Sequence, residues 1–479
     1  MGEILKEFAL KFNGSIRLEA RKERLTSEAG ALLLREVDER LGLSQWLVER
    51  LKDPRDAARI THPLEELVRT HLLLLGQGWR DQDDADELRQ DGALRLGVSE
   101  RKSTGPLEQQ EGAPQGLASQ PTLSRTVGIL AGEQNQQVLR EGLVWGTGRR
   151  LRAQQPQGQK LPRVTVDVDS LPVEVHGAQP GSAYNGHYHT RIYHPLVALL
   201  AESGDILDVQ LREGQVHTAN GALEFLEPLL QRVELHVSQE VALRMDAGFP
   251  EDTLLSRLEQ RGTQYVARVR NTSVLKDEAA VPRFLLLGLP EGEPQTRFYE
   301  WQYQAQGWSR ARRAVLVLQQ VQGELFPNAF WLVTSFSAEQ MPAEDLLEHY
   351  RQRGTAEAHM GELMDVLAPA LSSAPRPKRH YRGKLPVVRT VSVDSFAHNQ
   401  VRLLLNALAY NLVHSTRALL ADSTGESWSL LRVRQRVLKV PARLLLHSRR
   451  VILVIGQQAA GYWRALWYTL RSFDTAQVT

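Results

Sequence analysis

Apolar positions at helical spacing dominate residues 1–150. One apolar run follows Thr26 and breaks at Gly42, and a second run begins at Pro63 and ends at Gly78. Proline in a first helical turn and glycine just after a last turn are typical helix boundaries. A loop rich in Ser, Gly, Pro and Gln follows, and then a further short helical stretch, PTLSRTVGILAGEQNQQVLREGLVWGTGR. The pattern therefore predicts a helical N-terminal domain.

Over residues 160–270 the helical spacing gives way to short β-branched runs separated by turn residues. The runs are RVTVDVDSLPV, RIYHPLVALLA, DILDVQLREG, VALRMD and QYVARVR. Two helix candidates lie before and after the fourth run, VALRMD: ANGALEFLEPLLQRVELH and PEDTLLSRLEQRG. Three strands, a helix, a strand, a helix and a strand are typical of a layered α/β sheet. We therefore predict the first part of an α/β core here.

The pattern changes again over residues 271–336, where the helical spacing disappears and aromatic or aliphatic residues alternate with polar ones. This alternation predicts a small antiparallel β unit inserted into the core. Helical spacing returns over 337–420, the predicted second part of the core. Basic residues dominate 421–479, where the sequence indicates strands or a hairpin and then a helix carrying Trp463 and Trp467.

Two aspartates lie two positions apart in the first predicted strand, Asp167 and Asp169. Because side chains alternate along a strand, both carboxylates face one side, and two like charges so close share a proton or need a cation. Asp246 follows another apolar strand, and Glu357 lies on a later helix. Carboxylates from two strands and a helix can hold two Mg²⁺ ions for phosphoryl transfer on nucleic acid. The alternative is an edge-strand charge, a turn former and a solvated helix residue.

Composition narrows the chemistry. The chain has no cysteine, which excludes disulfides and thiolate metal sites, so any metal must bind oxygen or imidazole. The net charge is only +2, but basic residues dominate after about Pro375, which predicts an anionic partner there. No apolar window of about 18 residues and no signal-peptide pattern is present, so we expect a cytoplasmic protein that does not span a membrane.

Several groups of side chains are candidates for DNA contact. Phosphate-binding cations are predicted in two basic stretches, the alternative being a solvated basic face; they include Lys378, Arg379, Arg382, Lys384, Arg434, Arg436, Arg449 and Arg450. Ser124 and Arg125 begin a candidate recognition helix, and a packing or dimerisation module is the alternative. His187, His189 and Arg191 are candidate contacts beside the site, with a structural role as the alternative. No carboxylate-and-histidine helix motif supports zinc there.

The motifs DVDSLPVEVHG, YNGHYHTRIYHPLVAL, RMDAGFPEDTLLSRLEQRGTQYVARVR, YRQRGTAE and FAHNQVRLLLNALAYNL resemble those of bacterial insertion-sequence transposases with a DDE catalytic domain. The resemblance is closest to the insertion-sequence family numbered thirteen-eighty and runs over nearly the whole chain. It implies an RNase H-like catalytic core interrupted by a β-rich insertion between the second Asp and the Glu.

The resemblance also implies residue roles. Asp169, followed by Ser170, is expected to be the first catalytic acid, Asp246 the second and Glu357 the third. These three acids would bind two Mg²⁺ or Mn²⁺ ions. Asp167 would be a neighbour that shares or tunes the metal site.

Around the third acid, the family pattern of Tyr, Arg and Glu matches Tyr350 and Arg353, on one face of a predicted helix and expected to contact DNA. Two positions depart from many relatives, which have Thr where this chain has Leu171 and Lys where it has Met364. The expected DNA-facing side of the helix therefore lacks one cation. Trp308, in the insertion, is a candidate for base stacking, and the hydrophobic core is its alternative.

The activity implied by the resemblance is binding of terminal inverted repeats, cleavage with water as nucleophile, and joining of the freed 3′ hydroxyl ends to target DNA. Two ends held together imply at least a homodimer on double-stranded DNA. Two alternatives stay open: an inactivated or domesticated relative that only binds DNA, and an RNase H-like nuclease without strand transfer.

Overall fold

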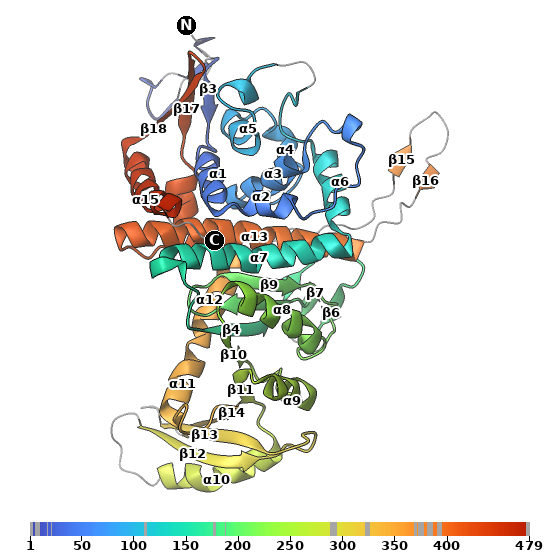
Figure 1. The fold of residues 1–479 in the computed structure, drawn as a ribbon, viewed down its shortest axis with the longest axis vertical. Coiled ribbons are helices and arrows are strands. Elements are labelled where there is room, and N and C mark those ends of the chain that lie inside the picture. Colours follow the sequence, from blue (N-terminus) through green and yellow to red (C-terminus); the bar gives the residue numbers. More distant parts are fainter. Residues whose placement is uncertain are drawn as a thin grey trace.

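The computed structural model describes residues 3–4, 10–16, 18–20, 22–109, 113–175, 179–186, 188–287, 295–320, 326–367, 371, 378–380, 387–389 and 395–475 of the 479-residue chain. The fold is mixed α/β. Two long helices, α7 (Glu133–Gln154) and α13 (Ser395–Thr424), pack side by side between a large mixed sheet and a helical body (Figure 1). Although α13 runs for 30 residues, no helix in the described part of the chain is long and apolar enough to cross a membrane.

The sheet has eight strands in the order β12-β13-β14-β11-β10-β4-β8-β9. The part of the sheet that comes first along the chain contains β4 (Arg163–Ser170), β8 (Leu196–Leu200), β9 (Ile206–Gln210), β10 (Glu240–Met245) and β11 (Gln264–Val269). β4 runs parallel to β10 and antiparallel to β8; β10 runs parallel to β11, and β8 antiparallel to β9. The predicted helices α8 (Ala222–His236) and α9 (Asp252–Arg261) are present, and each predicted strand is found. The run RIYHPLVALLA, however, divides at His194 and Pro195 into β7 (Thr190–Tyr193), which belongs to a separate sheet, and β8.

The alternation along β4 divides its side chains between two faces. Val164, Val166 and Val168 are fully buried in one core cluster, together with Phe225 and Leu226 of α8. The intervening Thr165, Asp167 and Asp169 therefore face the opposite side of the sheet, as the period of two predicts.

The inserted segment extends the same sheet. It forms α10 (Ser273–Leu287), β12 (Gln295–Tyr303), β13 (Arg312–Gln320) and β14 (Asn328–Thr334), and β14 pairs antiparallel with β11. The predicted antiparallel strands are present, but the prediction that helix is absent from this segment was wrong. In α10, Leu275, Ala279 and Leu286 pack against Trp331 and the strands. The helical spacing was masked because Pro282 and exposed valines lie between these positions.

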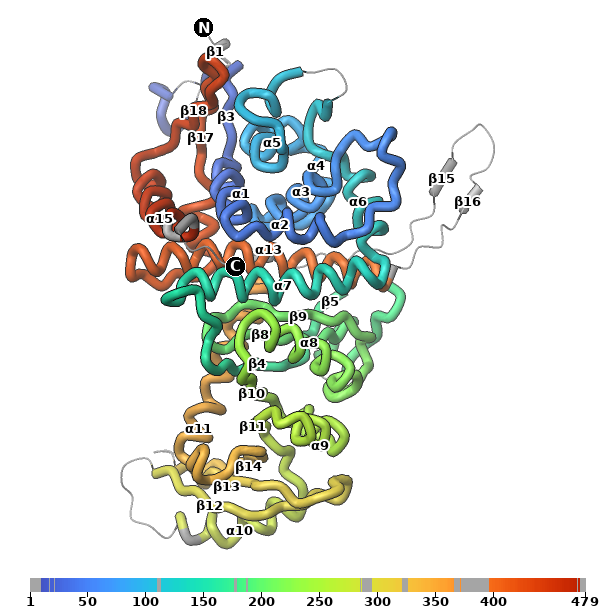
Figure 2. Tube along the Cα trace, in the orientation of Figure 1, coloured from blue at the N-terminus to red at the C-terminus, as the bar shows by residue number. Residues whose placement is uncertain are grey.

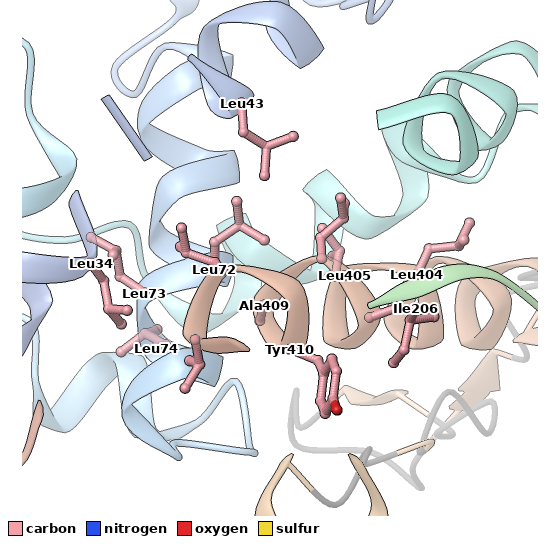
Figure 3. Close-up of a cluster of buried hydrophobic side chains, with 14 of the residues drawn as sticks. Leu34, Leu43, Leu72, Leu73, Leu74, Ile206, Leu404, Leu405, Ala409 and Tyr410 are labelled. Atoms are coloured by element: carbon pink, nitrogen blue, oxygen red, sulfur yellow. The ribbon is translucent and has the colours of Figure 1, made fainter. Parts of the chain in front are cut away.

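The helical body has a leucine-rich core that spans distant parts of the chain. Leu72 of α3, Leu405 of α13 and Ile206 of β9 lie in one cluster (Figure 3). Gly42 has a φ of 70° between the first two helices, the left-handed conformation expected of a helix-ending glycine. The helices are α1 (Gly30–Leu41), α2 (Leu43–Val48), α3 (Leu64–Gln77), α4 (Asp84–Glu87), α5 (Gly92–Val98) and α6 (Gln120–Leu130).

Segments from the first thirty and the last forty residues of the chain pair in one small sheet of the helical body (Figure 2). The hairpin β17 (Ala442–His447) and β18 (Arg450–Ile455) pairs with β3 (Arg24–Thr26), and α15 (Gln457–Thr475) follows it. The hairpin and final helix agree with expectation. The prediction of strands over Leu430–Leu438 was wrong: α14 (Leu430–Val433) and a π-helical turn occupy it, because the apolar residues there fit one buried helical face.

Smaller sheets complete the described fold. Three short strands beside the central sheet are ordered β5-β7-β6: β5 (Val173–Glu174), β6 (Ala183–Asn185) and β7 (Thr190–Tyr193). Two further pairs are β1 (Glu3–Ile4) with β2 (Glu19–Ala20) and β15 (Lys378–His380) with β16 (Val387–Arg389).

Helix α13 satisfies the backbone of the edge strand β9 with side-chain amides. Asn411 accepts a hydrogen bond from the Ile206 N–H at 2.9 Å and donates to the Ile206 carbonyl at 2.7 Å. Gln400 accepts from the Leu211 N–H at 2.6 Å and donates to the Val209 carbonyl at 3.0 Å. These amides replace the missing neighbouring strand, so the edge is both covered and paired.

We expect Asn411→Leu to lower the free energy of unfolding by roughly 2–4 kcal/mol, because two buried backbone groups of Ile206 lose their partners. Asn406→Leu is the matched control, since Asn406 lies on the same helix but donates to the Arg402 carbonyl of its own helix. The Asn406→Leu substitution should lower the free energy of unfolding by less than about 1 kcal/mol. Urea denaturation of both variants measures the difference, and equal losses would contradict the pairing of α13 with β9.

Candidate active site

Asp169 and Asp246 leave two neighbouring parallel strands at the same level. The register pairs Val168 of β4 with Met245 of β10, and each aspartate is the next residue along its strand. Carboxyl ends of adjacent parallel strands are where ligand-binding groups gather in α/β sheets. The pairing of β4 with β10 therefore brings the first two predicted acids together.

The third acid reaches this edge through an arginine. Glu357 lies on α12 (Arg353–Glu362), and its carboxylate accepts a hydrogen bond from Arg353 Nη1 at 2.6 Å. The Nη2 of the same guanidinium donates to Asp169 Oδ2. The side chains of Asp169 and Glu357 are 17% and 59% exposed. We call Asp169, Asp246, Glu357 and Arg353 the acid cluster.

Electrostatics link the members of this cluster. Burial raises the pKa of Asp169 to about 6; the carboxylates of Asp246 and Glu357 act in the same direction, while Arg353 and the Ser170 N–H oppose them. The Ser170 N–H donates to Asp169 Oδ1 at 2.8 Å. A carboxyl group whose pKa lies near neutrality and is set by charged neighbours is typical of functional sites.

A tight turn holds Asp246, and a buried arginine holds the neighbouring loop that packs against this turn. The Gly248 N–H donates to Asp246 Oδ1 at 2.7 Å, and a Cβ at Gly248 would lie 2.8 Å from the side chain of Thr218. Arg212, which is 6% exposed, donates to the carbonyls of Thr218 at 2.8 Å and Asn220 at 2.7 Å. Sequence reasoning missed Arg212, because its acceptors are backbone groups that carry no sequence signal.

Asp167 has a different partner. Arg244 of β10 donates to its two oxygens, from Nε at 2.5 Å and from Nη2 at 2.6 Å, and also to the carbonyl of His349. Both side chains of the ion pair are at most 2% exposed. Burial raises the pKa of Asp167, and the two hydrogen bonds from Arg244 oppose that shift. The cation that the paired aspartates require is therefore an arginine at this position, and a role of Asp167 in metal binding stays a prediction.

The acid cluster has the donor chemistry of a divalent-ion site. Its carboxylate oxygens are the donors that Mg²⁺ and Mn²⁺ prefer. Within the described ranges, however, no three acidic or imidazole side chains are placed to hold one ion. In this arrangement Arg353 neutralises two of the acids, so the donor set fits a metal and its geometry does not.

The helix that carries the third acid is divided. One continuous helix was predicted, but α11 (Ala343–Arg351) ends before Gln352, and α12 passes into a π-helical turn over Leu363–Leu367. Gly354, just after the break, weakens helical continuity. Tyr350 is half-buried at the end of α11. Burial raises its pKa, the charges of Arg353 and Arg268 oppose that shift, and the carboxylates of Asp246 and Asp169 add to it.

The two departures from the family pattern share one environment. Leu171 and Met364 are both partly buried and pack against the main hydrophobic core. A cation at position 364 would have to leave that contact, so the substitution matches the local packing.

An exposed tyrosine beside the acids was also missed. Tyr188 lies between β6 and β7; burial raises its pKa, and the charges of Asp169 and Asp246 contribute to the shift. Its signal was its place within the motif HYHTRIYH. His189, next to it, is exposed with a φ of 54°, and Arg191 donates to the Ser182 carbonyl at 2.6 Å.

The other predicted contacts lie away from the acids or outside the described residues. Arg125 is exposed and Ser124 half-buried on α6; Arg436 is exposed and Arg434 half-buried on the π-helical turn; Arg449 and Arg450 form the exposed tip of the β17–β18 hairpin. Lys378 and Arg379 lie on β15, and nothing is described of their side chains. His187, Arg382 and Lys384 lie outside the described residues.

Trp308 belongs to the hydrophobic core in this structure. It is 7% exposed, with the Arg312 guanidinium 4.9 Å from its ring centroid and Tyr303 edge-on at 5.6 Å. The core alternative therefore accounts for this residue, and its ring offers no open face to a base.

Comparison with known proteins places the chain in a sequence family. A family model described as "Transposase DDE domain group 1" matches residues 8–374 and 379–473. No curated protein matches. A cryo-EM structure of a piggyBac transposase synaptic complex with hairpin DNA is similar at 13% sequence identity and a TM-score of 0.37, over 94% of this chain and 82% of that chain. This structural similarity is too weak to transfer a residue or an activity.

Two isosteric substitutions on β4 should separate the two aspartates. Asp167→Asn leaves the buried Arg244 without a counter-charge and should lower the free energy of unfolding by roughly 3–5 kcal/mol. Asp169→Asn leaves Arg353 paired with Glu357 and removes a carboxylate with like-charged neighbours, so its effect should stay within about 1 kcal/mol. Chemical denaturation in metal-free buffer measures both. A larger loss of stability for Asp169→Asn than for Asp167→Asn would contradict the assignment of Asp167, and not Asp169, to the structural ion pair.

Proposed function

The chain belongs to the family of transposases with a DDE domain of group 1, and we propose that it cuts DNA at the ends of a mobile element and joins those ends to target DNA. The observation that carries this proposal is the meeting of Asp169 and Asp246 at the ends of paired strands, with Glu357 tied to Asp169 through Arg353. Three acids from two strands and a helix suit phosphoryl transfer.

We further propose that the core is RNase H-like. Its support is the strand order β9-β8-β4-β10-β11, in which β8 runs antiparallel to its neighbours while β4, β10 and β11 are parallel. The three strands of the inserted segment then continue the sheet beyond β11. In this scheme the insertion lies between the second acid and the third, as the resemblance implies.

The proposed reaction has two displacements at phosphorus. In cleavage, a water oxygen forms the new bond to phosphorus and the 3′ oxygen leaves; in joining, that 3′ hydroxyl oxygen attacks a target phosphate and displaces another oxygen. Asp169, Asp246 and Glu357 are the proposed catalytic acids. Arg353, a planar fork of donors beside them, is proposed to bind a phosphate oxygen, with Tyr350 next to it.

Mg²⁺ or Mn²⁺, two ions at each site, remains part of the proposal. A bound divalent ion supplies electrostatic stabilisation of the entering and leaving oxygens. The donor set supports this cofactor, while the observed arrangement, with Arg353 between two of the acids, does not.

The proposed partners are the terminal inverted repeats and the target DNA. Exposed cations of the helical body support this proposal: Arg125, Arg436, Arg449 and Arg450. Two element ends, each needing one acid cluster, support action as a homodimer on DNA. The alternatives are DNA binding without cleavage and nuclease activity without joining.

We expect the chain to cleave a plasmid that carries the DNA flanking its gene, in the presence of Mg²⁺ or Mn²⁺ and not of EDTA. Glu357→Gln should lower the cleavage rate at least about 1000-fold, because the acids act as a unit. The matched control is Glu348→Gln, since Glu348 is exposed on α11 and paired with Arg351; it should cleave like the wild type. Gel analysis of 3′ ends and joined products measures both steps.

The outcomes of that assay separate the three functions. Binding of the ends by the wild type and by Glu357→Gln, with cleavage by neither, would replace the transposase with a DNA-binding protein. Cleavage without any joined product would favour the nuclease.

Binding of end DNA should weaken with salt, because cations that neutralise phosphates release counterions. We expect Arg449→Ala with Arg450→Ala to reduce the slope of log affinity against log salt by roughly 2. Arg257→Ala is the control, since Arg257 is 50% exposed and paired with Glu227 on α8. Fluorescence anisotropy at several salt concentrations measures the slopes, and an unchanged slope for the double variant would remove the hairpin tip from the DNA interface.

A further inference from the structure

Helix α12 is held from two sides. Arg353 and Glu357 lie on the side that faces Asp169. At 100° per residue, His359 and Glu362 project from a different side of the helix, and their partners belong to α13 and to the turn between β8 and β9. The rotation of α12 about its axis, and with it the position of Glu357, therefore depends on both sets of contacts.

Glu362 makes the strongest of the contacts with α13. Arg417 Nη1 donates to both of its oxygens, at 2.9 and 2.6 Å, and the Leu430 N–H donates to Oε1 at 3.0 Å. Burial raises the pKa of Glu362, but the hydrogen bonds from His359 and Leu430 and the charge of Arg417 outweigh it and lower the pKa to about 2. The carboxylate is thus ionised and held by the Arg417 guanidinium and the Leu430 N–H.

His359 is fitted against the sheet. Its imidazole lies over Gly204, where the φ is 79° and an added Cβ would overlap the ring. Its Nδ1 is 3.1 Å from the Tyr410 hydroxyl and 3.3 Å from Arg417 Nη2. A side chain at position 204 would displace the His359 ring from this place.

The other end of the network is anchored in the buried core. His414 Nε2 lies 2.7 Å from the Ser203 carbonyl and must donate to it, so its Nδ1 accepts from Arg417 Nη2 at 2.6 Å. Burial lowers the pKa of His414 to about 3, which agrees with this neutral tautomer. Beside it, the fully buried Asp205 pairs with Arg150 of α7. The network therefore joins α12 to the sheet and to both long helices.

Well-packed apolar residues would give α12 comparable stability, because a partly buried ion pair gains little over them. What directional bonds add is a defined register and rotation. Resting on the proposed function, we propose that Glu362 and Arg417, with His359, are positioning residues for the catalytic acid Glu357. A displacement of about 1 Å at a reacting group can cost on the order of 100-fold in rate.

The test is the double variant Glu362→Gln with Arg417→Met, which removes both charges together and leaves no buried charge unpaired. The control is Glu234→Gln with Arg261→Met, a pair of the same residue types between α8 and α9 that is also partly buried but more exposed than the pair at 362 and 417. Single-turnover cleavage of end DNA gives the maximal rate and the half-saturating protein concentration. Hydrogen exchange of the α12 amides gives a readout that needs no activity.

For the double variant at 362 and 417 we expect a maximal rate 10- to 100-fold lower at unchanged half-saturation, with faster exchange confined to α12 and its neighbouring turn. The single variant Arg417→Lys keeps one charged donor and should recover part of the rate. The control pair should match the wild type in both measurements. An unchanged rate, or a change in half-saturation alone, would overturn the positioning role.

Failure of the proposed function is distinguishable from failure of this inference. If the wild type does not cleave DNA, hydrogen exchange alone decides: faster exchange of the double variant confined to α12 supports the positioning of α12 by Glu362 and Arg417, and unchanged exchange overturns it. If exchange rises throughout the helical body, the network serves global stability and the positioning role is overturned.

Discussion

The burial of two negative charges on one face of the central strand β4 is the constraint on which the rest of the structure depends. Asp167 is neutralised by Arg244 of the neighbouring strand, and Asp169 by Arg353 of α12. Arg244 also donates to the His349 carbonyl of α11. The two arginines therefore supply the counter-charges and also tie α11 and α12 to the face of the sheet that carries the acids. Without them, burial of these carboxylates would oppose folding.

The same logic of paired polar groups extends to the long helix α13. Its amides complete the edge of the sheet at β9, and its Arg417 and His414 hold the far side of α12. Its leucines meanwhile belong to the core of the helical body. One helix thus connects the body that displays most of the exposed candidate cations to the helix that carries Glu357, so the geometry of the acid cluster depends on packing far from it.

Much of the fold was predictable because local patterns agree with the tertiary structure. The alternating valines of β4 and the glycines after α1 and α3 specified elements that the structure contains. Prediction failed where local signals conflict. In α10, Pro282 and exposed valines obscured the apolar face that packs against Trp331. Around Gln352, the helix break is shorter than one turn, so it did not interrupt the helical spacing of the sequence. Arg212 and Tyr188 were missed because their partners are backbone groups or distant carboxylates.

By itself, the sequence determined that two carboxylates share a face of one strand, that two further acids follow in order, and that the chain resembles DDE transposases. Those conclusions need only the alternation of side chains and the wording of motifs. Only the tertiary structure decided which cation each aspartate meets, because Arg244 lies 77 positions from Asp167 and Arg353 lies 184 positions from Asp169. Pairing over such separations depends on strand register and helix packing, which no local pattern contains.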